Sequence, residues 1–319
     1  MNDIPRAAQA LRAGELVAFP TETVYGLGAD AGNPQAVAKI FAAKGRPADH
    51  PLIVHLPDAG HLPRWASDIP GVAYRLAAAF WPGPLTLILR RHASVSDAIT
   101  GGQETVGLRV PSHPVALELL RQFGGGIAAP SANRFGHVSP TTAAHVRDEF
   151  CSDVDTILDG GPCAVGIEST IVDLSSGSPR ILRPGMLDAS VLAPVLGTVP
   201  DFGTTAAAPR VSGSLDSHYA PTTPLQLVAE PDAENAVRAA VEAGRSVIVY
   251  SPRPATTSHP GLLWRIAAGD PTRYAQELYA QLREFDGLRR DLILVVRPPS
   301  TEAWRAVLDR LTRAAAGAK

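Results

Sequence analysis

The chain has 319 residues, and 45% of them are hydrophobic, which is enough to build the cores of two domains. Its 29 Lys and Arg nearly balance its 31 Asp and Glu, which excludes a broadly basic nucleic-acid-binding surface and leaves only a local basic groove. Cys151 and Cys163 lack the spacing of metal or disulfide motifs. With neither a signal-peptide core nor an apolar run of about 20 residues, we expect a cytoplasmic protein without membrane contact.

Short apolar strands alternate with helical segments from the N-terminus to about residue 197. Two helices are predicted from a capping residue followed by proline: Asn33 precedes a helix over 35–44, and Ser139 precedes one over 141–150. This alternation predicts an α/β fold, and some strands lie too close in sequence for every neighbouring pair to be parallel. The predicted strands are residues 16–19, 52–56, 85–90, 105–110, 126–130, 155–159 and 169–174.

Residues 198–222 are rich in Gly, Pro, Ser, Thr and Ala and have no hydrophobic period, as is typical of a linker between domains. We therefore expect one domain over residues 1–197 and a smaller one over residues 223–319. Strands and helices alternate again in the smaller domain, which predicts a Rossmann-like α/β structure. Apolar residues at helical spacing within 270–285 are expected to belong to its core.

The stretch FPTETVYGLGAD, residues 19–30, follows an apolar strand but mixes proline, threonine, glutamate, tyrosine and glycine. This mixture favours neither a helix nor a long strand, so something other than local propensity must select it.

Phosphate, if it is bound, must be held by side chains, because the sequence contains neither a GxxxxGK[ST] loop nor a GxGxxG fingerprint. Lys44 and Arg46 flank a glycine in AKGRPADHPL, where an extended backbone sends both cationic groups to the same side. Lysine and arginine together suit the oxygen array of a polyphosphate. The alternative is an ordinary solvated charge pair at the end of a helix.

Four other segments place polar residues beside apolar strands. The segment APSANRFGHVSP offers small donors and acceptors, ESTIVDL begins a strand, and ILRPG ends one. TVGLRVP holds an arginine inside an apolar strand, where an unpaired guanidinium would be costly to bury. The structural alternatives are respectively a turn, a strand cap, a loop cation and a buried ion pair. The residues concerned are Ser131, Asn133, Ser139, Ser169, Thr170, Arg183 and Arg109.

Seven motifs follow one another over residues 5–190: FPTETVYGLGAD, KGRP with HPLIVHL, WPGPLTLIL, GLRVP, PSAN with HVSPT, ESTIVD and ILRPG. In this order they closely resemble the YrdC-like threonylcarbamoyl-adenylate synthases. HYAP and LYAQLREFD further resemble the long form of that family, which has an additional C-terminal domain after a linker. The resemblance implies a twisted, largely mixed sheet with helices, followed by the smaller α/β domain.

The resemblance also implies a nucleotidyltransferase reaction. L-threonine, bicarbonate and ATP, with Mg²⁺, would give threonylcarbamoyl-AMP and pyrophosphate. Separate downstream proteins would then transfer the threonylcarbamoyl group to tRNA, forming threonylcarbamoyladenosine. No protein ligands to a metal are implied, and no residue stands out as a general base.

Roles for individual residues follow from the resemblance as well. FPTETVYGLGAD would form a wall of the threonine and bicarbonate pocket, shaped by Glu22 and Tyr25, and Arg109 would clamp the threonine carboxylate. From the linker, His218 and Tyr219 would close over the phosphates. His50 stands where many relatives have asparagine. ATP contacts are implied for Lys44, Arg46, His50, Thr105, Ser131, Asn133, Ser139, Arg183 and Tyr219; catalytic roles for Lys44, Arg46, Ser131 and Asn133; and threonine contacts for Thr23, His55, Arg109 and Ser169.

Two other classes of function remain as alternatives. The first is an RNA-binding module, in which Lys44, Arg46, Arg109, Arg134 and Arg183 would make weak contacts with an RNA backbone; the near-neutral charge and the lack of interleaved aromatic residues argue against it. The second is the carbamoyl-transfer domain of hydrogenase maturation factors, which shares the fold. Those proteins bring zinc-finger cysteines that this chain lacks.

Overall fold

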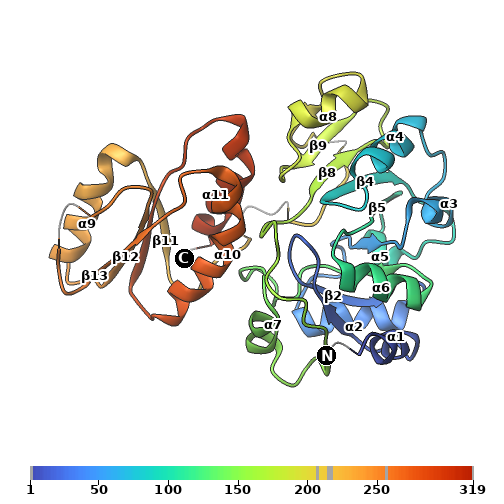
Figure 1. Ribbon diagram of the computed structural model, residues 1–319, viewed down its shortest axis with the longest axis horizontal. Coiled ribbons are helices and arrows are strands. Elements are labelled where there is room, and N and C mark those ends of the chain that lie inside the picture. Colours follow the sequence, from blue (N-terminus) through green and yellow to red (C-terminus); the bar gives the residue numbers. More distant parts are fainter. Residues whose placement is uncertain (1–2, 206–207, 214–217, 256–257, 318–319) are drawn as a thin grey trace. The chain divides into compact units, whose positions relative to one another are not determined.

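The computed structural model describes residues 3–205, 208–213, 218–255 and 258–317 (Figure 1). Contacts divide the chain into two compact units. Unit 1 consists of Met1–Phe135 and Ser139–Ser214, and unit 2 consists of Gly136–Val138 and Leu215–Lys319. Among the described residues, no helix combines the length and the apolar character needed to cross a bilayer.

Unit 1 is built on a mixed sheet whose described strands run in the order β10-β9-β8-β4-β5-β3-β6-β2-β1-β7. Strand β5 is parallel to β3 and antiparallel to β4, which confirms the expected mixed sheet. The strands are β1 Val17–Phe19, β2 Gly26–Asp30, β3 Ile53–His55, β4 Leu85–Arg90, β5 Thr105–Arg109, β6 Ile127–Ala128, β7 Thr156–Ile157, β8 Thr170–Asp173, β9 Arg180–Arg183 and β10 Asp201–Phe202.

Helix α2 shows how the sequence sets the ends of a helix in unit 1. The Asn33 side chain accepts hydrogen bonds from the backbone N–H groups of Gln35 and Ala36, as predicted, and Gly45 ends the helix with a φ of 62°. The helices of this unit are α1 Ile4–Arg12, α2 Pro34–Lys44, α3 Leu62–Trp65, α4 Gly71–Phe80, α5 Asp97–Thr100, α6 Pro114–Phe123, α7 Ala143–Phe150 and α8 Ala189–Leu196, with a 3₁₀ turn, η1, at Ala59–His61.

The cap predicted for the helix after residue 140 is wrong. Helix α7 begins at Ala143, and the Thr142 hydroxyl caps it by accepting from the backbone N–H of His145 at 3.2 Å. Ser139 lies before this turn because the carbonyl of the next residue, Pro140, accepts a hydrogen bond from the Tyr25 backbone, which holds the chain against residues 19–30. The Ser139 hydroxyl donates instead to the buried carboxylate of Glu168.

The last part of FPTETVYGLGAD is a strand, β2, which the mixed composition did not predict. It pairs antiparallel with both β1 and β6. A Cβ added at Gly28 would lie 2.8 Å from side-chain carbons of Ile127 and Phe19, so glycine is required for these strands to pack this closely. Glycine in this stretch argued against a strand in the sequence, but close packing against the neighbouring strands requires it.

Unit 2 contains a parallel sheet in the order β11-β14-β12-β13, as the Rossmann-like expectation requires. Figure 1 shows α10 and α11 together on one side of it and α9 on the other. Its strands are β11 Leu225–Val228, β12 Val247–Ser251, β13 Leu262–Ile266 and β14 Leu292–Val296; its helices are α9 Ala233–Glu242, α10 Pro271–Gly287 and α11 Arg305–Ala316, with 3₁₀ turns η2 Glu230–Asp232 and η3 Glu302–Trp304.

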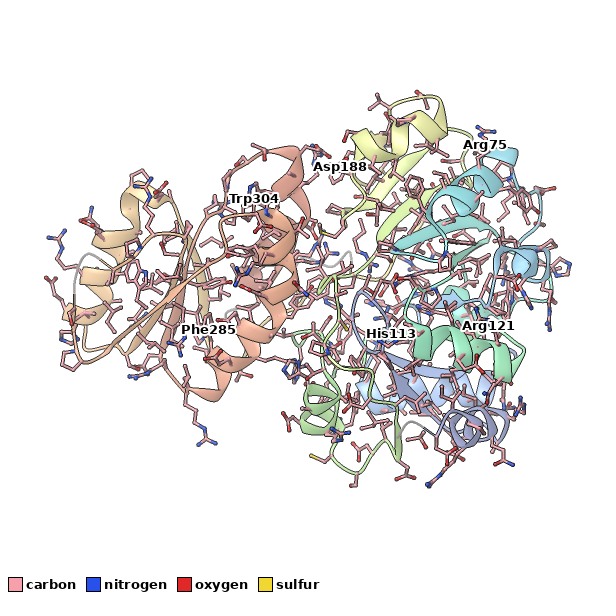
Figure 2. The ribbon with its side chains drawn as sticks, in the orientation of Figure 1. Arg75, His113, Arg121, Asp188, Phe285 and Trp304 are labelled. Carbon is pink, nitrogen blue, oxygen red and sulfur yellow. The ribbon has the colours of Figure 1, made fainter. Side chains whose placement is uncertain are left out.

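The apolar face predicted in residues 270–285 is confirmed, because Tyr274, Leu278, Leu282 and Phe285 of α10 are all buried. Phe285 packs edge-on against Tyr250 of β12, and Tyr274 packs edge-on against Trp304. Figure 2 labels Phe285 on α10 and Trp304 just before α11. This aromatic layer joins α10 to the sheet and to the start of α11.

Candidate active site

Four buried polar residues meet where β3 and β5 run side by side. His55 and Arg109 are register partners at the ends of these strands. Arg109 Nη1 donates to the Thr23 hydroxyl at 3.0 Å, and its Nη2 lies 2.7 Å from the Glu22 carboxylate. The Arg109 and Glu22 side chains are only 5% and 8% exposed. We call Glu22, Thr23, His55 and Arg109 the Arg109 group.

The conformation of residues 21–24 places the acidic partner of Arg109. The Thr21 hydroxyl donates to the carbonyl of Val24 at 2.6 Å and accepts from the backbone N–H of Thr23, which closes a tight turn. The turn directs Glu22 towards Arg109, and the second Glu22 oxygen accepts from the backbone of Ser112 at 3.0 Å. The buried ion pair is the structural alternative considered for Arg109 in the sequence.

His55 lies in this group as a neutral imidazole. Burial, and then the positive charge of Arg109, lower its pKa to about 3. Within the described residues its Nδ1 has no hydrogen-bond partner, although the side chain is buried. A buried ring nitrogen of this kind is available to a ligand.

A second buried group joins the predicted residues Ser169 and Arg183. Arg183 donates through Nε and Nη2 to the Ser169 carbonyl at 3.1 and 3.0 Å, and Nη2 also donates to its hydroxyl. That hydroxyl lies 2.7 Å from the hydroxyl of Thr86 on β4. Residues predicted separately for threonine and for ATP are thus in direct contact.

A third group contains Lys44, Ser131 and Asn133. The Lys44 ammonium donates to the backbone carbonyl of Ser131 at 2.6 Å and to that of Asn133. Burial, followed by the charge of Arg46, lowers the pKa of Lys44 well below its usual value. The alternative considered from the sequence, a solvated charge pair at a helix end, does not hold for Lys44, because this side chain is buried within unit 1.

The remaining predicted residues of unit 1 make other contacts. Arg46 donates to the Pro51 carbonyl at 3.0 Å. His50 packs edge-on against Phe135, and burial lowers its pKa, with the Arg46 charge as the next cause. Thr105 begins β5 opposite Arg90, and the Ser139 hydroxyl donates to Glu168 at 2.7 Å.

Tyr219 belongs to unit 2. Its ring stacks on Tyr279 of α10 with centroids 5.6 Å apart, and the Arg310 guanidinium lies 5.3 Å from its centroid. His218, beside it, is also buried. Residues 214–217, just before this pair, lie outside the described residues.

Three further residues contact the predicted ones and were not assigned to ligands from the sequence. Glu22 was expected only to shape a wall, although the buried Arg109 signalled that an acid should lie nearby. Thr86 had a weaker signal, a hydroxyl inside the apolar run LTLILR. Glu168, which accepts from Ser139, had no signal beyond its place beside ESTIVDL.

The fold and the site define a two-unit α/β protein whose larger unit buries arginine, lysine, histidine and hydroxyl groups along a mixed sheet. A family model described as "Telomere recombination" matches residues 9–185, and one described as "Threonylcarbamoyl-AMP synthase, C-terminal domain" matches residues 185–316. The chain belongs to the threonylcarbamoyl-AMP synthase family.

Relatives of known name match nearly the whole chain. The threonylcarbamoyl-AMP synthase of Bacillus subtilis is 40% identical over 98% of this chain and 93% of its own length. That of Pyrococcus abyssi is 39% identical over 97% of this chain and 92% of its own length. The crystal structure of P. abyssi Sua5 complexed with L-threonine is similar to this chain with a TM-score of 0.90 and 38% identity, covering 98% and 94% of the two chains.

Proposed function

We propose that the chain is a threonylcarbamoyl-AMP synthase. The neutral amine of L-threonine would attack bicarbonate and water would leave, giving a carbamate. An oxygen of this carbamate would then displace pyrophosphate from the α-phosphorus of ATP, and the product would supply the cytoplasmic proteins that transfer the threonylcarbamoyl group to tRNA. The observation that carries the proposal is the Arg109 group, a buried cluster of polar side chains in a chain that aligns over nearly its full length with relatives of this name.

The Arg109 group supplies what an amino-acid substrate needs. Arg109 has five N–H donors; Gly83 and Thr23 engage one each, and Nη2 lies beside Glu22 without a hydrogen bond among the described residues. Nη1 and Nη2 each keep an N–H that suits one of the paired oxygens of the threonine carboxylate. Because Glu22 already balances the charge, the site would hold the zwitterion without a large net charge.

Neutral His55 adds a nitrogen that neither repels the threonine ammonium nor competes for the carboxylate. The Thr23 and Ser169 hydroxyls would make the remaining contacts with the substrate threonine. Ser169 also contacts Arg183, so one serine would lie between the amino acid and the nucleotide.

On the ATP side, the proposal assigns phosphate contacts to the buried cations. A phosphate beside Lys44 would favour its charged form and would replace the carbonyl partners that the ammonium has now. Arg46 and Arg183 would stabilise the negative charge that develops on the phosphate oxygens as the carbamate oxygen attacks the α-phosphorus and pyrophosphate departs. His50, Thr105, Ser131, Asn133 and Ser139 complete the ATP contacts that we propose for unit 1.

Magnesium enters this proposal as a companion of ATP. Within the described ranges, no three His, Cys, Asp or Glu side chains are grouped so that they could hold a metal ion. The acids nearest the site are already engaged, Glu22 with Arg109 and Glu168 with Ser139. We therefore assign the ion to phosphate oxygens, where it would neutralise charge, and assign no residue to it.

Burial separates this proposal from the RNA-binding alternative. The side chains of Lys44, Arg46, Arg109 and Arg183 lie inside unit 1, with at most 6% of each residue exposed. A nucleic-acid backbone needs cations at the surface, so these four suit a small enclosed ligand better than a polymer. Arg134 is exposed, but it pairs with Asp153 at 2.8 Å.

The test is pyrophosphate release with each substrate omitted in turn. Release should require both L-threonine and bicarbonate in addition to ATP, and mass spectrometry should detect threonylcarbamoyl-AMP. Equal release after rigorous removal of bicarbonate would reject the proposed reaction. Salt-sensitive RNA binding without any pyrophosphate release would favour the alternative module.

A further inference from the structure

Unit 2 contains a cavity that the proposed reaction does not use. Its volume is about 420 Å³, and it lies at the carboxyl ends of β11, β12 and β14. We call it the α9 pocket, because Glu230 and Glu234 at the start of that helical segment form one side. Ser251, Arg253, Trp264 and Val296 contribute most of the rest.

The topology of the sheet explains why a crevice opens there. Strand β11 leads into α9, while its neighbour β14 leads into α11, and Figure 1 shows these helices on opposite sides of the sheet. Adjacent parallel strands whose connections leave in opposite directions form a topological switch point, the usual ligand position in open α/β sheets. Val296 ends β14, and Glu230 follows the end of β11 by two residues.

The lining combines an aromatic wall with hydrogen-bonding groups. The Trp264 indole donates to the Arg253 carbonyl at 2.8 Å, which fixes the ring, and this partly buried side chain lines the pocket. Ser251 is 3% exposed and accepts from the Arg253 backbone at 3.1 Å, which leaves its hydroxyl hydrogen without an acceptor among the described residues. Glu230 forms an ion pair with Arg253 at the rim.

The charges of this pocket discriminate between ligand classes. The turn AEPDAE between β11 and α9 lacks the glycines of a phosphate-binding loop, and it carries Glu230, Asp232 and Glu234. Two of these carboxylates, Glu230 and Glu234, line the pocket and disfavour a phosphate, since Arg253 pairs with only one of them. Carboxylates near a switch point accept hydrogen bonds from the hydroxyls of a ribose.

We propose that the α9 pocket binds an unphosphorylated purine nucleoside. Its two-ring base would stack on the Trp264 indole. A purine covers more of the indole than a single-ring base does, so it gains more from stacking. Its ribose hydroxyls would donate to Glu230 and Glu234, and Ser251 would donate to an acceptor of the ligand. This site is separate from the residues assigned to the threonylcarbamoyl-AMP reaction.

Hydrogen–deuterium exchange of the full-length protein with adenosine as the probe tests the proposal and localises the site. Adenosine should slow exchange in peptides covering residues 229–236 and 247–254. AMP at the same concentration should protect these peptides less. Glu234→Gln should raise the adenosine concentration for half-protection about tenfold, because a hydrogen bond to a carboxylate is lost, while Glu242→Gln on the same helix should leave it unchanged.

Two results would overturn the proposal. One is protection by adenosine confined to unit 1, where the proposed ATP residues lie. The other is equal protection of residues 229–236 by AMP and adenosine, which would contradict the exclusion of phosphate. Because both results are read as hydrogen exchange in assigned peptides, neither depends on whether pyrophosphate release is observed.

Discussion

His55 should make unit 1 sensitive to acid. Its pKa is about 3 in the folded chain, against 6.5 ordinarily. Below pH 6.5 the unfolded chain therefore binds a proton that the folded chain does not bind until about pH 3, so the free energy of unfolding falls as the pH decreases through this interval. One proton corresponds to about 1.4 kcal/mol per pH unit, which amounts to about 2 kcal/mol between pH 7 and pH 5.

Urea unfolding of the wild-type chain and His55→Gln at pH 7 and pH 5 measures this effect. Replacing Trp264 and Trp304 of unit 2 by phenylalanine in both makes fluorescence report on unit 1. The wild type should lose about 2 kcal/mol more than His55→Gln over this interval, since all other titrating groups cancel in the comparison. His92→Gln removes an exposed imidazole and should behave as the wild type does. Equal losses for His55→Gln and the wild type would refute the buried neutral imidazole.

Three other predictions test different parts of unit 1. Glu22→Gln should lower the free energy of unfolding by about 3–5 kcal/mol, because it leaves the Arg109 charge buried without its partner; a loss below about 1 kcal/mol in urea unfolding would contradict the pair. Gly185→Ala places a Cβ 2.4 Å from a backbone nitrogen of β8 and should lower the melting temperature, whereas Gly71→Ala has room and should not. Lys44→Ala should chiefly raise the ATP concentration needed for half-maximal pyrophosphate release, and Arg109→Ala should chiefly raise the threonine concentration needed. If both variants changed only the ATP concentration, and equally, the division of roles would be contradicted.

The sequence predicted the elements whose signals are local. Asn33 followed by proline identified α2 correctly, because a cap is formed within one turn of the helix. The same pattern at Ser139 failed, because the Tyr25 backbone, more than a hundred residues away, holds the carbonyl of Pro140. Strand β2 was missed since its glycine is selected by side chains of other strands, which composition does not report.

The site was predictable as a set of residues but not as a set of contacts. Sequence reasoning identified Arg109 as costly to bury alone, yet its partner Glu22 lies far away in the chain and reaches it only through the turn at Thr21. Thr86 and Ser169 likewise meet only because β4 and β8 pair. Local patterns thus indicate which groups need partners, and the order of strands in the sheet decides which partners they find.

The linker shows how such contacts bear on the proposed mechanism. Arg210 exchanges two hydrogen bonds with the Gln103 side chain, and Val211 packs with apolar residues of β4, β8 and β9. Beside them, the Ser212 carbonyl accepts from Arg183 Nη1 at 2.8 Å. A guanidinium proposed for ATP phosphates therefore already holds the linker within unit 1. If a phosphate takes that donor, the linker loses a hydrogen bond, so by thermodynamic linkage ATP binding and the docking of residues 208–212 must oppose each other.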